Sequence, residues 1–283
     1  MGKRFIAVSR EDLISAYRET GTFKESAKVL GMGRGTFSRL WWDKVGIDPS
    51  QFKDGPPKIF RIGIVSDTHL GSRFQQLTHL KDFYRSARLN GCSCIVHAGD
   101  LTDGYTTAPS RRKNQFITSP DDMIDYVVGN YPNDLKTYFI SGNHDEKFVK
   151  SLGIDVCREI SRNRTDMEFI GSMYGGLEFG NIIISHGIGN FAEYSRVGTN
   201  KKLYSVLSRP PELIINGHTH TWDIVPRWAG AELLINTPCM VGGHIGTGGL
   251  NYRPSIGAMI VEFGDPGKHS LNCVYFNEIE DDF

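Results

Sequence analysis

The fold of this chain is decided by the stretch IFRIGIVSDTHL, which spans residues 59–70. It is a short apolar run that ends in two potential metal ligands, Asp67 and His69. Apolar runs of this length, bounded by turn signals, predict a buried strand. Because residues i and i+2 at a strand end point the same way, we expect Asp67 and His69 to converge on one ion while Thr68 points away.

Four later segments repeat this design, each after a short β-leaning run. They are GDLTDG at 99–104, GNHD at 142–145, SHG at 185–187 and GHTH at 217–220. One polar strand end is weak evidence, because a lone buried histidine is usually a satisfied core residue and an aspartate before a turn is usually a cap. Five such ends in one chain indicate a metal centre.

The composition is that of an ordinary globular protein. Of 283 residues, 39% are hydrophobic and 23% are charged, which suits one large domain with a small appendage. We expect no membrane span, because no apolar stretch approaches the roughly 18 residues required, and no secretory signal. The five cysteines, an odd number without C-x-x-C spacing, predict reduced, mostly buried thiols in a cytoplasmic protein.

Charge is spread unevenly along the chain, although the formal net charge is zero. Residues 1–58 carry eleven Lys/Arg against seven Asp/Glu, a net of +4, which leaves −4 for the remainder. A polar, proline-rich stretch at residues 48–57 follows this basic segment. Such a stretch is typical of a linker. We therefore predict two domains, a helical one at residues 1–55 and a larger one at residues 56–283.

The basic segment reads as helical. Ser9 with Asp12, and Thr22 with Glu25, have the spacing of capping boxes that begin helices. Gly31 fits a helix end in the left-handed conformation. A third helix is expected from about Arg34 through Trp42.

Residues 26–40 resemble a helix-turn-helix motif. In that family the second helix enters the major groove of DNA. The resemblance implies that the candidate DNA contacts are Arg34, Thr36, Ser38 and Arg39. Gly33 and Gly35 would weaken this helix by about 1 kcal/mol each relative to alanine, so a three-helix docking or oligomerisation module is the alternative. Trp41 and Trp42 are expected in the core.

Beyond the linker, β and α patterns alternate, and the second half is rich in strands. Strands are expected at residues 59–66, 94–98, 136–140, 167–170, 176–179, 181–184, 212–215, 224–228, 233–236, 258–263 and 271–276. Helices are expected at residues 77–90, near 120–128, in two short segments after 143, and within 194–207. This order predicts a layered α/β domain with two packed sheets.

Taken in order, the motifs D-x-H, G-D-x-x-D, G-N-H-D, S-H-G and G-H-x-H closely resemble the calcineurin-like metallophosphoesterase superfamily. The resemblance implies a four-layer α/β/β/α sandwich with two metal ions at the strand ends. By position, the first ion would be held by Asp67, His69, Asp100 and His220. The second would be held by Asp100, Asn143, His186 and His218, with Asp100 bridging.

The chemistry of these ligands favours particular metals. Imidazole nitrogens mixed with carboxylate and amide oxygens suit Mn, Fe, Zn or Ni rather than Ca or Mg, and Mn is the metal we expect. Two such ions can generate a bridging hydroxide at neutral pH and clamp the attacked phosphorus. The resemblance further implies that His144 stabilises the transition state or protonates the leaving oxygen, and that Asp103 orients it.

Some residues near or outside the motifs are not expected to bind metal. Asp145 is expected to be structural. Four histidines match no motif position and are expected to be structural or at the surface: His79, His97, His244 and His269.

One departure from the family bears on the substrate. In protein Ser/Thr phosphatases of this superfamily, an arginine that grips phosphate follows the G-D-x-x-D motif, whereas this chain has Gly104. A protein-phosphatase activity is therefore disfavoured. Candidate phosphate contacts from elsewhere are Arg73, Arg111 and Arg112, with Lys113, Arg196, Lys201 and Lys202 as further candidates. A solvated charged loop is the alternative for these cations.

The sequence therefore predicts a dimetal-dependent phosphoester hydrolase. We expect a phosphodiesterase or nuclease that acts on nucleic acid, in a layout similar to phage or prophage metallophosphoesterases, with no membrane partner. One alternative is a phosphoesterase for nucleotides or cyclic nucleotides whose N-terminal module only docks. Another is a DNA-binding protein without enzymatic activity.

Overall fold

The structure of the chain is a computed structural model that describes residues 8–46, 49, 60–187, 211–226, 233–243, 255–265 and 268–282. The backbone divides into two compact units. The helical unit comprises residues 1–59 with 263–269, and the α/β unit comprises residues 60–262 with 270–283. The predicted domain boundary between residues 55 and 56 lies outside the described residues.

The helical unit is a small three-helix domain. It contains α1 Arg10–Thr20, α2 Phe23–Val29, α3 Arg34–Leu40 and a π-helical turn, Trp41–Val45. The capping box predicted at Ser9 and Asp12 is present, with both reciprocal hydrogen bonds formed. At α2, the Thr22 side chain accepts a hydrogen bond from the Glu25 backbone. The turn between α2 and α3 contains Gly31 with a φ of +64°, as the sequence predicts.

The core of the helical unit is aromatic. Phe37 and Trp41 are fully buried and stack with ring centroids 5.9 Å apart. The prediction that Trp42 also lies in the core is wrong, because its side chain is 52% exposed. Successive residues differ by about 100° around a helix, so neighbours seldom face the same core. Gly33 is the N-cap of α3 and lies outside the helix, so the helical penalty applies to Gly35 alone.

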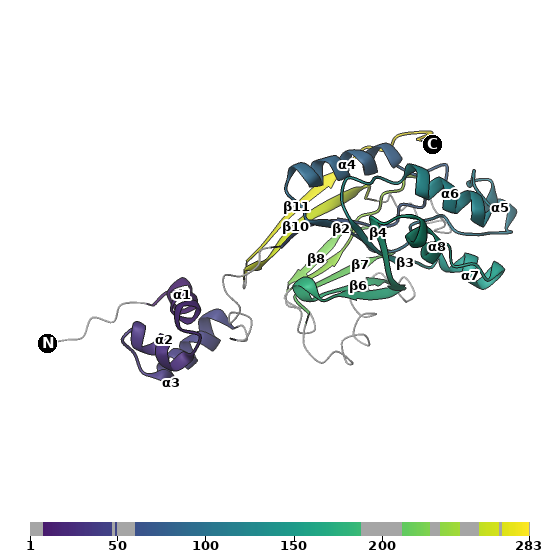
Figure 1. Cartoon of the computed structure of the whole chain (residues 1–283). Helices are drawn as coiled ribbons and strands as arrows, with labels where there is room; N and C mark the ends of the chain where they lie inside the picture. The colour runs from purple at the N-terminus through teal and green to yellow at the C-terminus, as the bar shows by residue number, and fades with distance from the viewer. Residues whose placement is uncertain are drawn as a thin grey trace. The chain divides into compact units, whose positions relative to one another are not determined.

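The α/β unit contains two sheets (Figure 1). The six-stranded sheet has the order β11-β10-β1-β2-β3-β4, and the five-stranded sheet has the order β5-β6-β7-β9-β8. The first consists of β1 Phe60–Val65, β2 Cys94–His97, β3 Thr137–Ser141, β4 Met167–Ser172, β10 Gly257–Asp265 and β11 Lys268–Tyr275. The second consists of β5 Tyr174–Leu177, β6 Ile182–His186, β7 Leu213–Gly217, β8 Asp223–Pro226 and β9 Leu233–Asn236.

The central strands of both sheets are parallel. β1 pairs with β2, β2 with β3 and β3 with β4 in the first sheet, and β6 pairs with β7 and β7 with β9 in the second. Strands β5 and β8 run antiparallel to their neighbours at the two edges of the second sheet. The carboxyl ends of β1, β2 and β3 therefore meet at one edge of the first sheet, and those of β6 and β7 meet in the second.

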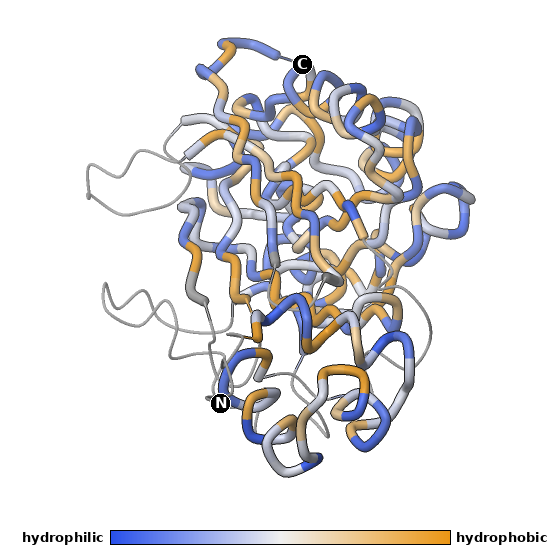
Figure 2. The backbone as a smooth tube through the Cα atoms, turned by 90° about the vertical axis from the view of Figure 1, so that its left-hand side faces the viewer, coloured by the Kyte–Doolittle hydropathy of each residue, from blue (hydrophilic) through white to orange (hydrophobic). Residues whose placement is uncertain are grey.

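The described helices of the α/β unit are α4 Leu77–Leu89, α5 Pro109–Arg112, α6 Pro120–Asn130, α7 Glu146–Leu152 and α8 Val156–Asn163. Apolar residues of α4, α6 and α8 share one buried cluster with the strands. The tube in Figure 2 is orange, and so hydrophobic, along many of the strands inside this unit. Four of the five free cysteines are buried and Cys273 is half-buried, as expected for reduced thiols.

Most predicted elements are present, with a few differences. The strand expected at 176–179 ends at Leu177, because Phe179–Asn181 forms a 3-10 turn in which Gly180 has a φ of 70°. The short helix α5 was not predicted. The helix expected within 194–207 lies outside the described residues. Within the part of the chain that the structure describes, no helix is long and apolar enough to cross a membrane.

Candidate metal centre

Five loops that follow parallel strands carry the predicted ligands. Asp67 and His69 follow β1, Asp100 follows β2, and Asn143 follows β3. His186 is the last residue of β6, and β7 is followed by His218 and then His220. Ligand sites of α/β proteins form where parallel strands end. The chain topology therefore brings together residues up to 153 positions apart in sequence, as between Asp67 and His220.

The backbone at these residues adopts an unusual conformation. Positive φ angles occur at Asp67 (51°), His69 (42°), Asp100 (53°), His218 (84°) and His220 (55°). Left-handed backbone is uncommon outside glycine and tends to gather at functional sites. The convergence of Asp67 and His69 was predicted from the alternation of a strand. The strand ends at Val65, so this reason is wrong, and two left-handed residues separated by Thr68 produce the convergence instead.

Three groups of side chains place their ligand atoms within 4.8 Å of one another, and two of them consist entirely of predicted ligands. The first group is Asp67, His69 and His220, in which Asp67 Oδ1 lies 3.2 Å from His220 Nε2. The second is Asp100, His186 and His218. Each of these two groups contains only residues that the family resemblance assigns to one ion. Asn143 is in neither group, and Asp100 is in the second alone, whereas the resemblance implies that it bridges both ions.

Asn143 lies beside the second group, and Asp100 connects that group to the first. His186 Nε2 is 3.2 Å from Asp100 Oδ2 and 3.2 Å from Asn143 Oδ1. Asp100 Oδ2 is also 3.7 Å from His69 Nε2, in the first group. A carboxylate in this position can bridge two ions. Gly142 permits the approach, because a Cβ there would lie 2.2 Å from the Asp100 backbone nitrogen.

The neighbours of two histidines fix which ring nitrogen is available. His186 Nδ1 lies 2.7 Å from the Ala98 carbonyl oxygen, to which it donates. His69 Nδ1 lies 3.1 Å from Asp103 Oδ1. In both rings Nε2 is therefore the nitrogen that would lose its proton and bind a metal, as in metal-ligating histidines.

The arrangement fits divalent metal ions. Asp67 Oδ1 and His69 Nε2 are buried and have no hydrogen-bond partner, although an unsatisfied buried polar atom costs about 1–3 kcal/mol. Their mixture of imidazole nitrogen and carboxylate oxygen is that of a transition-metal site. Two bound cations would satisfy both atoms.

The buried carboxylates and histidines of the site shift the pKa values of one another. Burial disfavours the charged form of His186, but Asp100 and Asp67 raise its pKa to about 10. Burial likewise opposes ionisation of Asp67, yet His220 and His186 lower its pKa. The carboxylates thus stabilise positive charge strongly at this place, whether a proton or a metal ion supplies it.

Asp103 lies between two histidines. Its Oδ1 is 3.1 Å from His69 Nδ1 and 3.4 Å from His144 Nδ1. The hydrogen bond of His144 Nδ1 goes to the Asp103 backbone oxygen, at 2.8 Å. Asp103 thus orients His144 mainly through its main chain, while its carboxylate contacts a predicted ligand. His144 also groups with His69 and Asp100 as a possible ligand set, a role that the sequence did not suggest.

Two buried residues outside the predicted ligand set hold these loops, Asp145, which was expected to be structural, and His97, which was expected to be structural or at the surface. The Asp145 carboxylate accepts hydrogen bonds from the backbone of Leu101, Thr102 and Gly142 and from the Thr102 hydroxyl. His97 Nε2 lies 3.1 Å from Thr68 Oγ1. His97 is thus structural, one of the two alternatives expected, and its place at the end of β2, three residues before Asp100, is consistent with that role.

Comparison with known families decides the class of protein. The sequence profile described as Calcineurin-like phosphoesterase matches residues 60–245, which is most of the chain. The chain belongs to the calcineurin-like phosphoesterases. This phosphoesterase is therefore a hydrolase of phosphoester bonds, in a family that uses divalent metals.

Solved structures with a similar fold include an archaeal phosphodiesterase, with 16% identity and a TM-score of 0.47 over 77% of this chain and 100% of that chain. A Streptococcus pneumoniae protein described as a predicted phosphoesterase has 14% identity and a TM-score of 0.38 over 77% and 100%. A Thermotoga maritima protein has 17% identity and a TM-score of 0.39 over 77% and 99%. No curated protein matches the chain.

The predicted phosphate contacts of this phosphoesterase lie on neighbouring exposed segments. Arg73 follows the first ligand loop, and its backbone nitrogen donates to Asn114, 2.8 Å away. Arg111 and Arg112 are exposed on α5. Lys147 was not among the predicted phosphate contacts. Burial lowers the pKa of its ammonium group, and the negative charges of Asp100 and Asp103 oppose that shift. Arg196, Lys201 and Lys202 lie outside the described residues.

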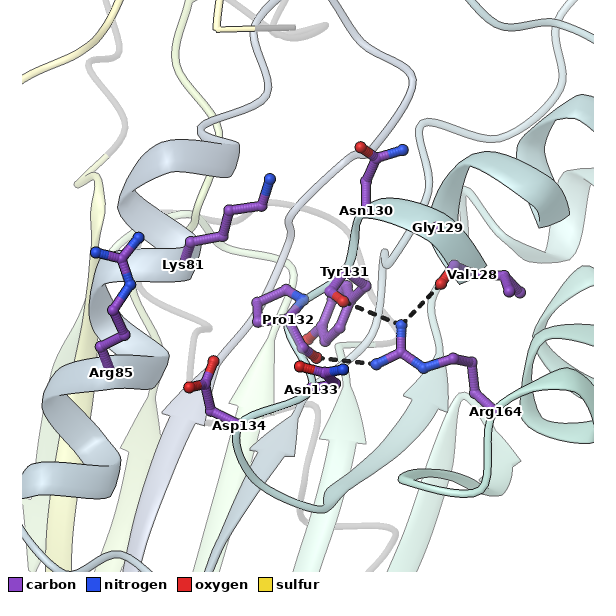
Figure 3. Close-up of a pocket in the computed structure, with 10 residues that line it drawn as sticks. All are labelled: Lys81, Arg85, Val128, Gly129, Asn130, Tyr131, Pro132, Asn133, Asp134 and Arg164. Carbon is purple, nitrogen blue, oxygen red and sulfur yellow. Dashed lines mark hydrogen bonds between the residues drawn. The ribbon is translucent and has the colours of Figure 1, made fainter.

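A separate polar hollow lies at the other end of the parallel strands. Lys81 and Arg85 of α4 line it, together with Asp134, which precedes β3, and Arg164, which precedes β4. Arg164 donates hydrogen bonds to the carbonyls of Val128, Tyr131 and Pro132 (Figure 3). Because these bonds occupy the guanidinium, Arg164 has a structural role. The hollow lies at the starts of the strands, whereas the predicted ligands lie at their ends.

The predicted DNA contacts all belong to α3 of the helical unit. Arg34, Thr36 and Arg39 are exposed, and Ser38 is half-buried.

Proposed function

We propose that this phosphoesterase is a dimetal-dependent phosphodiesterase or nuclease that acts on nucleic acid in the cytoplasm. The observation that carries the proposal is the pair of neighbouring ligand groups, in which the buried atoms Asp67 Oδ1 and His69 Nε2 have no hydrogen-bond partner. It is joined in one chain to a basic helical unit, in which α2 and α3 cover most of the stretch, residues 26–40, that resembles a helix-turn-helix motif.

The ligand roles follow from the two groups. Asp67, His69 and His220 would hold one ion, His186, His218 and Asn143 the other, and Asp100 both. We expect manganese, with iron, zinc or nickel as alternatives. When bound, two such ions supply Lewis-acid activation of the phosphoryl group and of the attacking water. They bring more positive charge than Asp67 and Asp100 neutralise, which favours an anionic substrate.

His144 is the proposed proton donor to the leaving oxygen. Its side chain is 17% exposed, so a substrate can reach it. Burial disfavours its protonated form, but Asp100 and Asp103 raise its pKa above the ordinary histidine value. A protonated His144 would supply the proton that a departing alkoxide requires, and the Asp103 carbonyl accepts from Nδ1, which leaves Nε2 for the substrate.

Gly104 supports a diester over a phosphoprotein substrate. It has a φ of +74°, and a Cβ there would lie 2.2 Å from the His144 carbonyl oxygen. An arginine in this position would not fit this backbone. Phosphate contacts would come instead from Arg73, Arg111 and Arg112.

Hydrolysis of bis-p-nitrophenyl phosphate beside p-nitrophenyl phosphate, with added Mn²⁺, tests the chemistry. We expect the diester to be the better substrate and His144→Ala to lose at least a hundredfold in kcat. Equal inertness of both proteins with metal bound would contradict the enzymatic proposal.

The nucleic-acid substrate is tested by salt dependence of DNA binding. Arg34→Ala with Arg39→Ala removes two proposed phosphate contacts and should reduce the slope of log K against log salt by roughly 2. The matched control is Lys81→Ala with Arg85→Ala, which removes two cations from α4. Equal slopes for both double variants would remove the support for DNA contact by α3.

A small-molecule phosphoesterase with a docking module is the second candidate. The exposed apolar side chains favour it, because Val29 and Trp42 are both 52% exposed on the helical unit. Such surfaces suit protein contacts. A Trp42→Glu change that disrupts self-association, with DNA binding absent in the intact chain, would favour this candidate.

A further inference from the structure

Two exposed aromatic rings lie next to a predicted metal ligand. Trp222 is 43% exposed and Tyr275 is 48% exposed. Their ring centroids are 5.9 Å apart, with the planes inclined at 54°. Large aromatic side chains are usually buried because each one contributes much apolar surface. A contacting pair that both remain open to solvent suggests that another flat, apolar group covers them.

The chain places this pair at the ligand end of the α/β unit. Trp222 is two residues from His220, so their Cα atoms are no more than about 7 Å apart. The His220 carbonyl accepts a hydrogen bond from Ser255 N, and the Ile256 carbonyl accepts one from Phe276 N. These two bonds attach the segments that carry Trp222 and Tyr275 to adjacent residues of one short stretch, 255–256.

Both rings belong to residues at the ends of strands. Trp222 immediately precedes β8, and Tyr275 is the last residue of β11. The backbone of Gly257 lies beneath the tyrosine, since a Cβ built there would come within 3.3 Å of Tyr275 Cδ1. Aromatic residues held on strands make rigid surfaces with little entropy to lose on binding.

We propose, as an extension of the nucleic-acid substrate proposed above, that Trp222 and Tyr275 form a platform for one nucleobase of the substrate, which stacks on the Trp222 ring with the inclined Tyr275 ring at its edge. The phosphodiester next to that base would then lie at the ligands of the metal centre. Every base has a flat π-face, so stacking on aromatic rings tolerates any sequence. The platform would therefore strengthen binding of nucleotidyl diesters over base-free diesters without selecting a sequence.

The test compares a dinucleotide with its fully abasic counterpart, both with Mn²⁺. Trp222→Ala should lower kcat/KM for the dinucleotide by about tenfold, within the range of about 5- to 150-fold for one stacked base. It should leave kcat/KM for the abasic diester unchanged. Trp222→Phe should retain most of the preference because it keeps a ring. An equal fall on both substrates, or none on either, would overturn the platform.

Tyr174→Ala is the matched control. Tyr174 is also exposed, but it lies on β5, at the opposite edge of the five-stranded sheet from β8. We expect it to leave the preference for the dinucleotide unchanged. A fall equal to that of Trp222→Ala would contradict a platform confined to Trp222 and Tyr275.

A binding measurement distinguishes an incorrect platform proposal from an incorrect proposed function. If the intact protein hydrolyses neither substrate, the proposed function fails, and a methylphosphonate dinucleotide still measures stacking. Weaker binding of this probe by Trp222→Ala than by the intact protein supports the platform. Equal binding, or no binding by the intact protein, overturns it.

Discussion

Asp145 and Thr102 are joined by two hydrogen bonds, from the Thr102 backbone nitrogen at 2.8 Å and from its hydroxyl at 2.7 Å, both to Asp145 Oδ1. The same carboxylate accepts from Gly142 N at 2.8 Å. One buried side chain therefore fixes the loop after β2 to the loop after β3. Burial and the nearby Asp100 raise the pKa of Asp145 to about 6, so it is mainly charged at neutral pH.

Asp145→Asn should destabilise the protein by about 3 kcal/mol, because an amide group would face donors that now meet a carboxylate. Thr102→Val removes one of the four hydrogen bonds and should cost about 1–2 kcal/mol. Urea unfolding monitored by circular dichroism measures both. Thr102→Ser keeps the hydroxyl and is the control, so a loss equal to that of Thr102→Val would show that the methyl group matters instead.

Asp103→Asn should weaken metal binding by about 10- to 100-fold, because the carboxylate contacts Nδ1 of His69 while Nε2 faces the metal. The His144 contact through the Asp103 carbonyl should survive this change. Titration calorimetry with Mn²⁺ on chelator-treated protein measures the affinity. Unchanged affinity with a large loss of kcat would instead assign the carboxylate to His144.

The clustering of the proposed ligands could be predicted from sequence because each lies at or just after a strand end and the short motifs keep their spacing. Asp67 and His69 illustrate the limit. Their convergence was expected, but the left-handed backbone that produces it depends on contacts with distant loops. Asp67 N, for example, donates to the Gly99 carbonyl at 2.9 Å. Pairings of this kind arise only when the sheet forms.

The supporting residues were harder to predict for the same reason. His97 and Thr68 are 29 positions apart, and only the parallel register of β1 with β2, which sets Val65 opposite His97, brings them together. The core helices α4 and α6 were predictable because their apolar residues recur with a local period. The same period places Trp42 about 100° away from the buried Trp41, so the prediction that both lie in the core did not follow it.

Gly104→Ala should lower kcat at least tenfold. The added methyl group would meet the His144 carbonyl oxygen at 2.2 Å, so the backbone of the proposed proton donor would have to move. Gly153→Ala is the matched control, because Gly153 has a similar φ of +73° with nothing within 4 Å of an added Cβ. Both variants carry the strain of a left-handed alanine, so a difference in kcat between them measures the clash. Equal kcat values would show that the loop yields without effect.

His97 should make the protein sensitive to acid. The Thr68 hydroxyl donates its proton to the Leu101 carbonyl at 2.8 Å, so His97 Nε2 must be the donor to Thr68 Oγ1, and the ring is neutral. Burial lowers the pKa of His97 to about 3, from an ordinary 6.5. Between these values the unfolded chain binds a proton that the folded chain does not.

The stability that this neutral ring contributes is therefore full above about pH 6.5 and is lost as the pH falls toward 3, by up to about 1.4 kcal/mol per pH unit. His97→Gln keeps a donor for Thr68 but cannot titrate, so its free energy of unfolding should fall less steeply with acidification than that of the intact protein. Urea unfolding at pH 7 and pH 5, with the same chelator in every sample, gives the two slopes. Identical slopes would mean that His97 is protonated in the folded protein or that its burial is relieved in solution.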